Sequence, residues 1–193
     1  MYVPIFHLLY KNHLSTGAYS SLPYDNYQVQ LFNGGVMWQG DSVQLAFDPL
    51  VNGLNADGSI IESYLDDDTE LTFGKTSSGA DEAYAGTAAA GTVVGNRENY
   101  VKIIRNDAEH ITRYLIKIPA AEIALTLGMN ERFGYTAVIN DADTLMREQY
   151  IGVTRGLGDY KAPGHYYTFT CLPSEKAKVP AAQSKDYVIQ FSD

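Results

Sequence analysis

The length, composition and charge of the chain limit what it can be. It has 193 residues, of which 45% are hydrophobic and 19% are charged, as is typical of a globular protein with one core. Its formal net charge is −9. A nucleic acid or an anionic membrane surface needs a basic partner, so this charge argues against both and favours a neutral ligand or a cation. Cys171 is the only cysteine, which excludes an internal disulfide and a cysteine-rich zinc site.

The start of the chain is apolar but lacks the pattern of a targeting segment. Residues 1–10 lack a basic leader and a small-residue cleavage site, so we predict no signal peptide there. No run of about 18 apolar residues occurs, and no membrane-spanning helix is predicted. Because a strand pattern follows Met1 almost at once, we expect residues 1–193 to be one domain excised from a longer protein.

Short strand patterns recur along the chain between turn-rich segments. We predict strands at residues 5–10, 43–47, 60–64, 69–73, 100–105, 111–118, 133–140, 166–172 and 187–191, and a short strand or loop edge at 27–32. Asn106 and Asp107 are expected to form a hairpin turn. Residues 74–95, which are rich in Ala, Gly, Ser and Thr, are expected to form a long mobile loop.

One helix is predicted, at residues 120–127. Pro119 suits the position before its first turn, and Gly128 suits its end. About nine strands, one short helix and no βαβ alternation predict an all-β fold, an antiparallel β-sandwich of the jelly-roll or immunoglobulin-like kind.

The strand at 43–47 alternates between apolar and polar side chains. Val43, Leu45 and Phe47 point one way and Gln44 points the other, which indicates a half-buried strand. Trp38, the only tryptophan, lies just before it. An aromatic ring at the mouth of a face that carries Gln44 suggests a platform for a small ligand. The alternative is a core strand with Trp38 as packing.

Motifs of common catalytic sites are missing from the sequence. The four histidines have no metal-binding spacing, and no G-x-S-x-G motif occurs. Paired carboxylates can hydrolyse a glycoside, and acidic loops occur at residues 66–68 and 141–143. Adjacent acids on a loop are more often a solvated turn or a calcium site, so we expect no enzyme activity from this chain alone.

An oxygen-rich turn follows the strand at 133–140. Asn140, Asp141 and Asp143 offer three side-chain oxygens within four residues, and Ca²⁺ is bound by six to eight oxygens, often from Asp side chains and loop carbonyls. We predict that they bind a structural calcium ion. The alternative is an Asx-turn formed by Asn140 and Asp141. The triplet Asp66–Asp68 is a second calcium candidate.

Sugar binding needs aromatic rings that stack on a pyranose and side chains that hydrogen-bond to hydroxyl groups. Trp38 and Gln44 are the first candidates for these roles. Tyr10, Tyr64 and Tyr150 are candidates for additional rings, although most of the tyrosines are expected in the core or on a sheet face.

Five stretches in order resemble the carbohydrate-binding modules of family 9 and their DOMON-like relatives. The first is Trp38–Gln44, which resembles W-x-x-D-S-V-E, and the second is Tyr64–Asp68, a tyrosine followed by an acidic run. The third, residues 114–123, is a strand that ends in a proline-started turn. The fourth, residues 133–147, resembles G-F-x-x-x-V-N-D-A-D with a later arginine, and the fifth, residues 158–164, is a K-x-P loop before the last core strand.

The resemblance implies a β-sandwich with bound calcium, often appended to secreted glycan-degrading enzymes. It therefore implies an extracellular or cell-surface location. The implied partners are a polysaccharide or oligosaccharide and the neighbouring domains of a parent chain.

In this family two tryptophans clamp a sugar, with help from an Asp, a Glu and an Arg. Trp38 matches the first tryptophan, Gln44 stands where the Glu is expected, and Asn12 stands roughly where the Asp is. The Arg position falls near Thr72 and the second tryptophan near Val153. Half of the clamp is therefore missing, which leaves open a different glycan or no glycan.

We thus predict a non-catalytic carbohydrate-binding module that binds a neutral saccharide. The main alternative is a structural or interaction domain that binds no sugar. Two further alternatives are a catalytic domain that uses the acidic loops and a haem-binding domain, which would need a facing Met and His pair.

Overall fold

The computed structural model describes residues 32–106, 108, 111–125, 131–142 and 145–170, together with the backbone of 6–11 and 187–189. The expectations for Asn12, Asp143, Cys171 and most of the 27–32 segment lie outside these residues.

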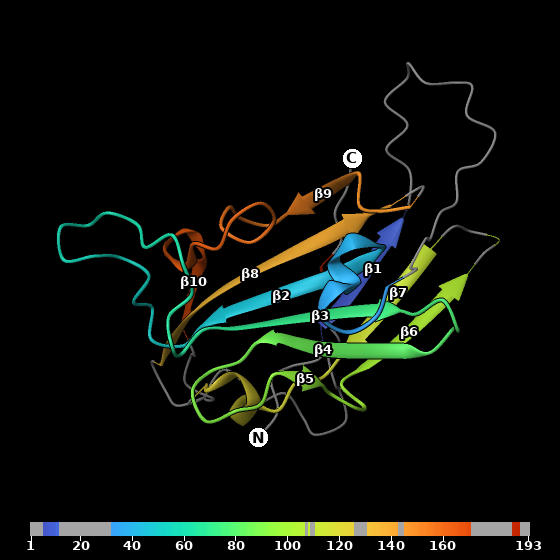
Figure 1. The fold of residues 1–193 in the computed structure, drawn as a ribbon, viewed down its shortest axis with the longest axis horizontal. Coiled ribbons are helices and arrows are strands. Elements are labelled where there is room, and N and C mark those ends of the chain that lie inside the picture. Colours follow the sequence, from blue (N-terminus) through green and yellow to red (C-terminus); the bar gives the residue numbers. More distant parts are fainter. Residues whose placement is uncertain are drawn as a thin grey trace, which may run out of the picture.

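The described strands form two sheets (Figure 1). The larger sheet has the order β10–β8–β2–β3–β4–β5, and β9 pairs with the end of β8 that β10 leaves free. Its strands are β2 (Ser42–Asp48), β3 (Thr69–Lys75), β4 (Asp81–Thr87), β5 (Gly95–Asn96), β8 (Arg132–Asp141), β9 (Gln149–Gly152) and β10 (Tyr167–Thr170). The smaller sheet has the order β11–β1–β7–β6, with β1 (Phe6–Lys11), β6 (Val101–Asn106), β7 (Ile111–Ile116) and β11 (Tyr187–Ile189). All pairs are antiparallel except β1 with β11, which confirms the predicted antiparallel sandwich with one parallel exception.

The core lies between the two sheets. Val43, Leu45 and Phe47 of β2 are at most 2% exposed and pack in one cluster with Ile103 and Ile116 of the smaller sheet. Each such side chain contributes roughly 1.5–3 kcal/mol through removal of apolar surface from water. The alternation of the sequence therefore identified the core face of β2 correctly.

The opposite face of β2 is also buried, which the alternating pattern did not predict. Its side chains, each at most 2% exposed, are Ser42, Gln44, Ala46 and Asp48. A second apolar cluster covers this face, because Leu157 and Tyr166, from the segment between β9 and β10, pack on Ala46 and on Val138 of β8. The large sheet thus has a covered outer face at β2.

The prediction of a long loop at residues 74–95 is wrong, because β4 lies within it. Ala83 and Ala85 of β4 are buried in the core and stand opposite Phe73 and Leu71 of β3. Small side chains are weak strand formers, but they fit beneath the large residues of β3. The expected strand at 60–64 is also wrong; only a single bridge joins Leu54 and Ile60.

The predicted helix is a short 3₁₀ turn, η2 (Ala120–Ile123). Ala124, with φ of 51°, ends it in the left-handed region. The predicted pairing of these two strands is confirmed, since β6 and β7 pair from Val101 with Ile116 to Asn106 with Ile111. Asn106 is the last residue of β6 and not a turn residue, and Asp107 lies outside the described residues. The helical segments of the described chain are all too short to cross a membrane.

Candidate functional site

A short 3₁₀ helix, η1 (Gly34–Gln39), contains Trp38 and lies against the strands β2, β3 and β4 (Figure 1). Met37 is fully buried and anchors this helix, and the Gly34 N–H donates a hydrogen bond of 2.7 Å to Glu82 Oε1. A Cβ on Gly35 would lie only 3.2 Å from the ring of Tyr84, so η1 packs closely on β4 at this glycine. Trp38 itself is 36% exposed and is therefore not a core residue.

Arg147 lies against two aromatic rings. Its guanidinium carbon is 5.0 Å from the ring centroid of Trp38 and 5.0 Å from that of Tyr150. Its Nη1 donates hydrogen bonds to Asn140 Oδ1 (3.1 Å) and to the Gly158 carbonyl (3.3 Å). The hydroxyl of Tyr150 donates to Asp159 Oδ2 at 2.7 Å, and this bond raises the pKa of Tyr150.

Beneath Arg147, a chain of hydrogen bonds crosses the covered face of the sheet. Asn140 Nδ2 donates to Ser42 Oγ and to Gln44 Oε1, both at 3.0 Å, and Gln44 Nε2 donates to Glu70 Oε1. Gln44 is only 2% exposed. Both ends of its amide are therefore engaged by neighbours on β8 and β3, and it supports the surface from below.

Glu70 joins this chain to a second pair of side chains. Its Oε2 accepts a hydrogen bond from the hydroxyl of Tyr64 and lies 2.8 Å from Lys161 Nζ. Lys161 also packs 5.7 Å from the ring centroid of Tyr64. Burial, followed by the nearby Glu70 carboxylate, raises the pKa of Tyr64. The hydrogen bonds thus run from Arg147 at one edge to Lys161 at the other.

Asp41, the acid of the Trp38–Gln44 motif, has a structural contact. Its Oδ1 accepts a hydrogen bond of 2.8 Å from the Ala142 N–H. This bond joins the start of β2 to the end of β8 and so fixes the strand that follows Trp38.

The predicted site residues are thus partly brought together. Trp38 and Tyr150 meet through Arg147, whereas Tyr64 lies at the far end of the hydrogen-bond chain and Gln44 lies in its middle. Val153, where a second tryptophan was expected, is 36% exposed and lines a shallow cleft of about 320 Å³ beside Tyr150. Arg147 was not predicted as a site residue, and its position after the Asn140–Asp143 turn was the only available signal.

The two described members of the predicted calcium turn have protein partners. Asn140 accepts from Arg147 and donates to its neighbours on β2, and Asp141 Oδ2 accepts a bond of 2.6 Å from Gln149 Nε2. Calcium binding at this turn stays a prediction.

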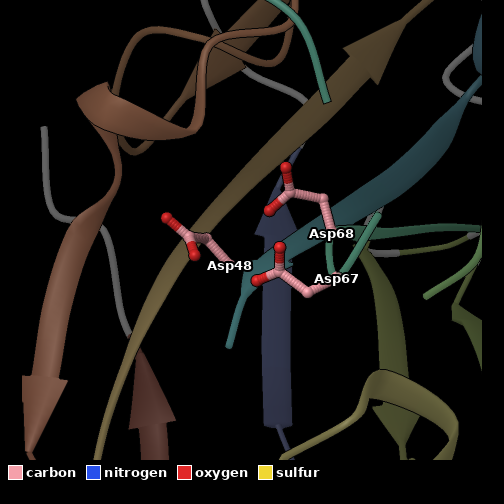
Figure 2. Close-up of side chains that lie close together, drawn as sticks. All are labelled: Asp48, Asp67 and Asp68. Atoms are coloured by element: carbon pink, nitrogen blue, oxygen red, sulfur yellow. The ribbon is translucent and has the colours of Figure 1, made fainter. Parts of the chain in front are cut away.

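A second polar group lies at the other end of β2 (Figure 2). Asp48, Asp67 and Asp68 each offer a carboxylate oxygen, and these oxygens lie within 4.8 Å of one another. Asp48 also lines a cleft of about 650 Å³ whose walls include Leu54 and Gly164. Six residue steps of about 3.3 Å along β2 separate this end from the Trp38 end by roughly 20 Å.

The comparisons with known proteins bear on the fold. No family model matches the chain, and no curated protein matches its sequence. The structure is similar to that of a family 9 carbohydrate-binding module from Caldicellulosiruptor kristjanssonii in complex with cellotriose, with a TM-score of 0.51 and 16% sequence identity. The match covers 78% of this chain and 69% of that chain. The chain therefore has the fold of the family 9 carbohydrate-binding modules, which confirms the fold that its five motifs predict.

Proposed function

We propose that the chain is a non-catalytic carbohydrate-binding module of an extracellular glycan-processing protein, and that it binds a neutral saccharide on the surface formed by Trp38, Arg147 and Tyr150. The observation that carries the proposal is the exposed indole of Trp38 with the Arg147 guanidinium beside it. The fold supports it, since the similar module from Caldicellulosiruptor kristjanssonii was solved with cellotriose.

The surface combines the two interactions that a neutral sugar requires. The rings of Trp38 and Tyr150 offer apolar faces or edges to the C–H groups of a pyranose, and each ring contact contributes roughly 0.5–1.5 kcal/mol. Arg147 uses Nη1 for Asn140 and Gly158, and the structure gives its Nε and Nη2 no acceptor among the described residues. We propose that these N–H groups donate to sugar hydroxyls.

Arg147 is held in place before any ligand binds. Its hydrogen bonds to Asn140 and Gly158 and its contacts with two rings restrict its rotamers. A donor that is already ordered loses little conformational entropy on binding, which favours affinity. Binding requires no bond to be made or broken.

Replacement of the indole tests the proposal. Trp38→Ala should abolish binding of cello-oligosaccharides, or of any glycan identified on an array, in calorimetry. Val36→Ala is the matched control, because Val36 is exposed on the same 3₁₀ helix. Unchanged binding of a confirmed glycan by Trp38→Ala would reject this surface as the site.

The second candidate function is an interaction domain that binds no sugar. It is favoured by the engagement of the polar groups of Gln44, Asn140 and Glu70 with one another, which leaves Arg147 as the main donor at the surface. A flat response across a broad glycan panel, together with stable association with a neighbouring domain, would support this candidate. Micromolar binding to any glycan would reject it.

A further inference from the structure

Between β9 and β10, residues 156–162 form a closed loop, which we call the cover loop. Its two ends meet, because the Ala162 N–H donates a hydrogen bond of 3.0 Å to the Gly156 carbonyl. Gly156 has a φ of 90°, and a Cβ on it would collide with the Ala162 carbonyl oxygen. Leu157 is fully buried in the apolar cluster on the outer face of β2. The cover loop is therefore a compact unit that is fixed to the sheet.

The middle of the cover loop supports the proposed ligand surface. The Gly158 carbonyl accepts the hydrogen bond of 3.3 Å from Arg147 Nη1, and Asp159 Oδ2 accepts that of 2.7 Å from the hydroxyl of Tyr150. The ring of Tyr150 also occupies the place that a Cβ on Gly158 would take. The position of the loop thus determines where one hydrogen-bond partner of Arg147 and one of Tyr150 lie.

Lys161 ties the cover loop to β3. Its Nζ lies 2.8 Å from Glu70 Oε2 and donates a hydrogen bond of 3.1 Å to the Leu157 carbonyl. Leu157 is near the start of the loop and Lys161 is near its end. The ammonium group therefore connects both parts of the loop with one buried carboxylate of the sheet.

The burial of Glu70 makes this ion pair important for the position of the loop. Glu70 is 7% exposed, and its oxygens accept hydrogen bonds from the neutral donors Gln44 and Tyr64. Among the described residues, Lys161 alone brings a positive charge to it. A carboxylate that is removed from water needs a counter-charge, and loss of one partner of such a pair is unfavourable. Glu70 thus holds Lys161, and with it the cover loop, against the sheet.

We propose that Glu70 and Lys161 are positioning residues for the ligand surface. Their ion pair sets the place of the cover loop, and the loop in turn orders Arg147 and Tyr150 before a ligand binds. Side chains that are ordered in advance lose less conformational entropy on binding, which favours affinity. The inference rests on the proposed saccharide binding where it concerns affinity, but not where it concerns the position of Arg147.

The only tryptophan of the chain can report this position directly. Arg147 Cζ lies 5.0 Å from the ring centroid of Trp38, so the fluorescence of Trp38 responds to the guanidinium without any ligand. If Glu70 and Lys161 had a purely structural role, their loss would lower the stability of the fold but leave the surroundings of Trp38 in the folded protein unchanged. The emission spectrum therefore separates the two roles.

Lys161→Met in the full chain tests the inference, because it removes the ammonium and keeps an unbranched side chain near the ring of Tyr64. In the ligand-free protein, Trp38 emission should move to longer wavelength and acrylamide should quench it more, since water replaces the guanidinium on the indole. Lys161→Arg should restore the wild-type spectrum, because a guanidinium also pairs with a carboxylate. Equal emission and quenching in the wild type and Lys161→Met would overturn the proposal.

Glu70→Gln removes the charge from the other side of the pair, and it decides the matter if Lys161→Met fails to fold. It should shift Trp38 emission in the same direction. The double variant should shift it no further than either single variant, as expected when two residues act as a unit. Glu122→Gln is the matched control, since it breaks an ion pair of 2.7 Å with Arg97 outside the cover loop. An equal spectral shift in this control would assign the effect to a general loss of stability and overturn the proposal.

Calorimetry with cellotriose measures the effect on affinity. Lys161→Met and Glu70→Gln should bind about threefold to tenfold more weakly than the wild type, because Arg147 and Tyr150 must then be ordered on binding. Glu122→Gln should bind as the wild type does. Equal affinity in the wild type and Lys161→Met would reject the positioning of the ligand surface. If the wild type binds no cellotriose, the proposed function fails for this sugar, and Trp38 emission still decides whether the ion pair positions Arg147.

Discussion

The guanidinium of Arg147 packs on the indole of Trp38, with 5.0 Å between Cζ and the ring centroid. A cation over an aromatic ring contributes roughly 0.5–1 kcal/mol at an exposed position. Because Arg147 is also bonded to Asn140, which is bonded to β2, the exposed pair rests on the buried hydrogen bonds of the sheet. A ligand that reaches Trp38 therefore meets an ordered cation as well.

The first prediction concerns Arg147. Arg147→Ala should weaken saccharide binding by about tenfold or more, because hydrogen bonds from a charged donor contribute roughly 1.5–3 kcal/mol. Arg147→Lys should recover only part of the affinity, since an ammonium group cannot stack on Trp38 and Tyr150 as a planar guanidinium does. Calorimetry with the glycan that the wild type binds provides the measurement. Stronger binding by Arg147→Ala would show that Arg147 covers the indole instead of assisting the ligand.

The second prediction concerns the buried amide of Gln44. Gln44→Glu should destabilise the fold by about 1–3 kcal/mol at pH 7, because a donor to Glu70 is replaced by a second carboxylate. When two carboxylates are adjacent, the pKa of one of them is raised. As the pH falls through that raised pKa this group becomes neutral, so the loss in the free energy of unfolding caused by Gln44→Glu should become smaller. Urea unfolding at pH 5 and pH 7 measures both effects.

Gln39→Glu, on the half-buried end of η1, is the control for added charge. A Gln44→Glu deficit that is equal at both pH values would contradict the carboxylate contact.

The core of the fold could be predicted from the sequence, because local alternation determines which residues share a face. Val43, Leu45 and Phe47 were assigned to the interior correctly for this reason. The burial of the outer face of β2 at Ala46 could not be predicted, because its cover comes from a segment about a hundred residues later whose packing is not encoded near β2. Strand β4 was missed because Ala83 and Ala85 owe their conformation to pairing with β3 and not to their own propensity.

In the candidate sites, too, contacts between segments far apart in the sequence could not be predicted. Trp38 and Tyr150 were named from the sequence, but their meeting through Arg147 depends on where β9 joins β8. The acidic triplet was noted as a calcium candidate, yet its closest partner, Asp48, is separated from it by a long loop. Sequence patterns identify residue types, whereas the convergence of distant loops needs the fold.

The third prediction concerns Asp81, which ties the β4 edge to the smaller sheet. Its Oδ1 lies 2.6 Å from Lys75 Nζ, and its Oδ2 lies 3.1 Å from Lys102 Nζ and accepts a bond of 3.2 Å from the Ile103 N–H. Burial alone would raise the pKa of Asp81, but these contacts outweigh it and lower the pKa.

Since the pKa is lower in the folded state than in the unfolded state, Asp81 stabilises the fold above the unfolded value. This contribution is lost as the pH falls through the folded pKa. Asp81→Asn should therefore cost about 1–3 kcal/mol at pH 7, and the difference from the wild type should fade below about pH 4. Denaturant titrations across this range measure it, with Glu98→Gln at an exposed position as control. A difference that persists at low pH would assign the loss to packing.

The fourth prediction concerns the contact between Gly53 and Gly164. A Cβ on Gly53 would lie 2.2 Å from Gly164 N, and a backbone atom cannot move aside as a flexible side chain can. Gly53→Ala should therefore displace the loop after β2 or the segment at Gly164, at a cost of about 1–3 kcal/mol in the free energy of unfolding.

Gly86→Ala is the matched control, because a Cβ there meets nothing within 4 Å. It should leave stability unchanged or raise it by up to about 1 kcal/mol through the lower entropy of the unfolded chain. Urea unfolding of both variants decides the matter. If Gly53→Ala is as stable as the wild type, the loop after β2 and the segment at Gly164 can move apart without cost. The segment that covers the outer face of β2 would then not depend on its contact with the loop after β2.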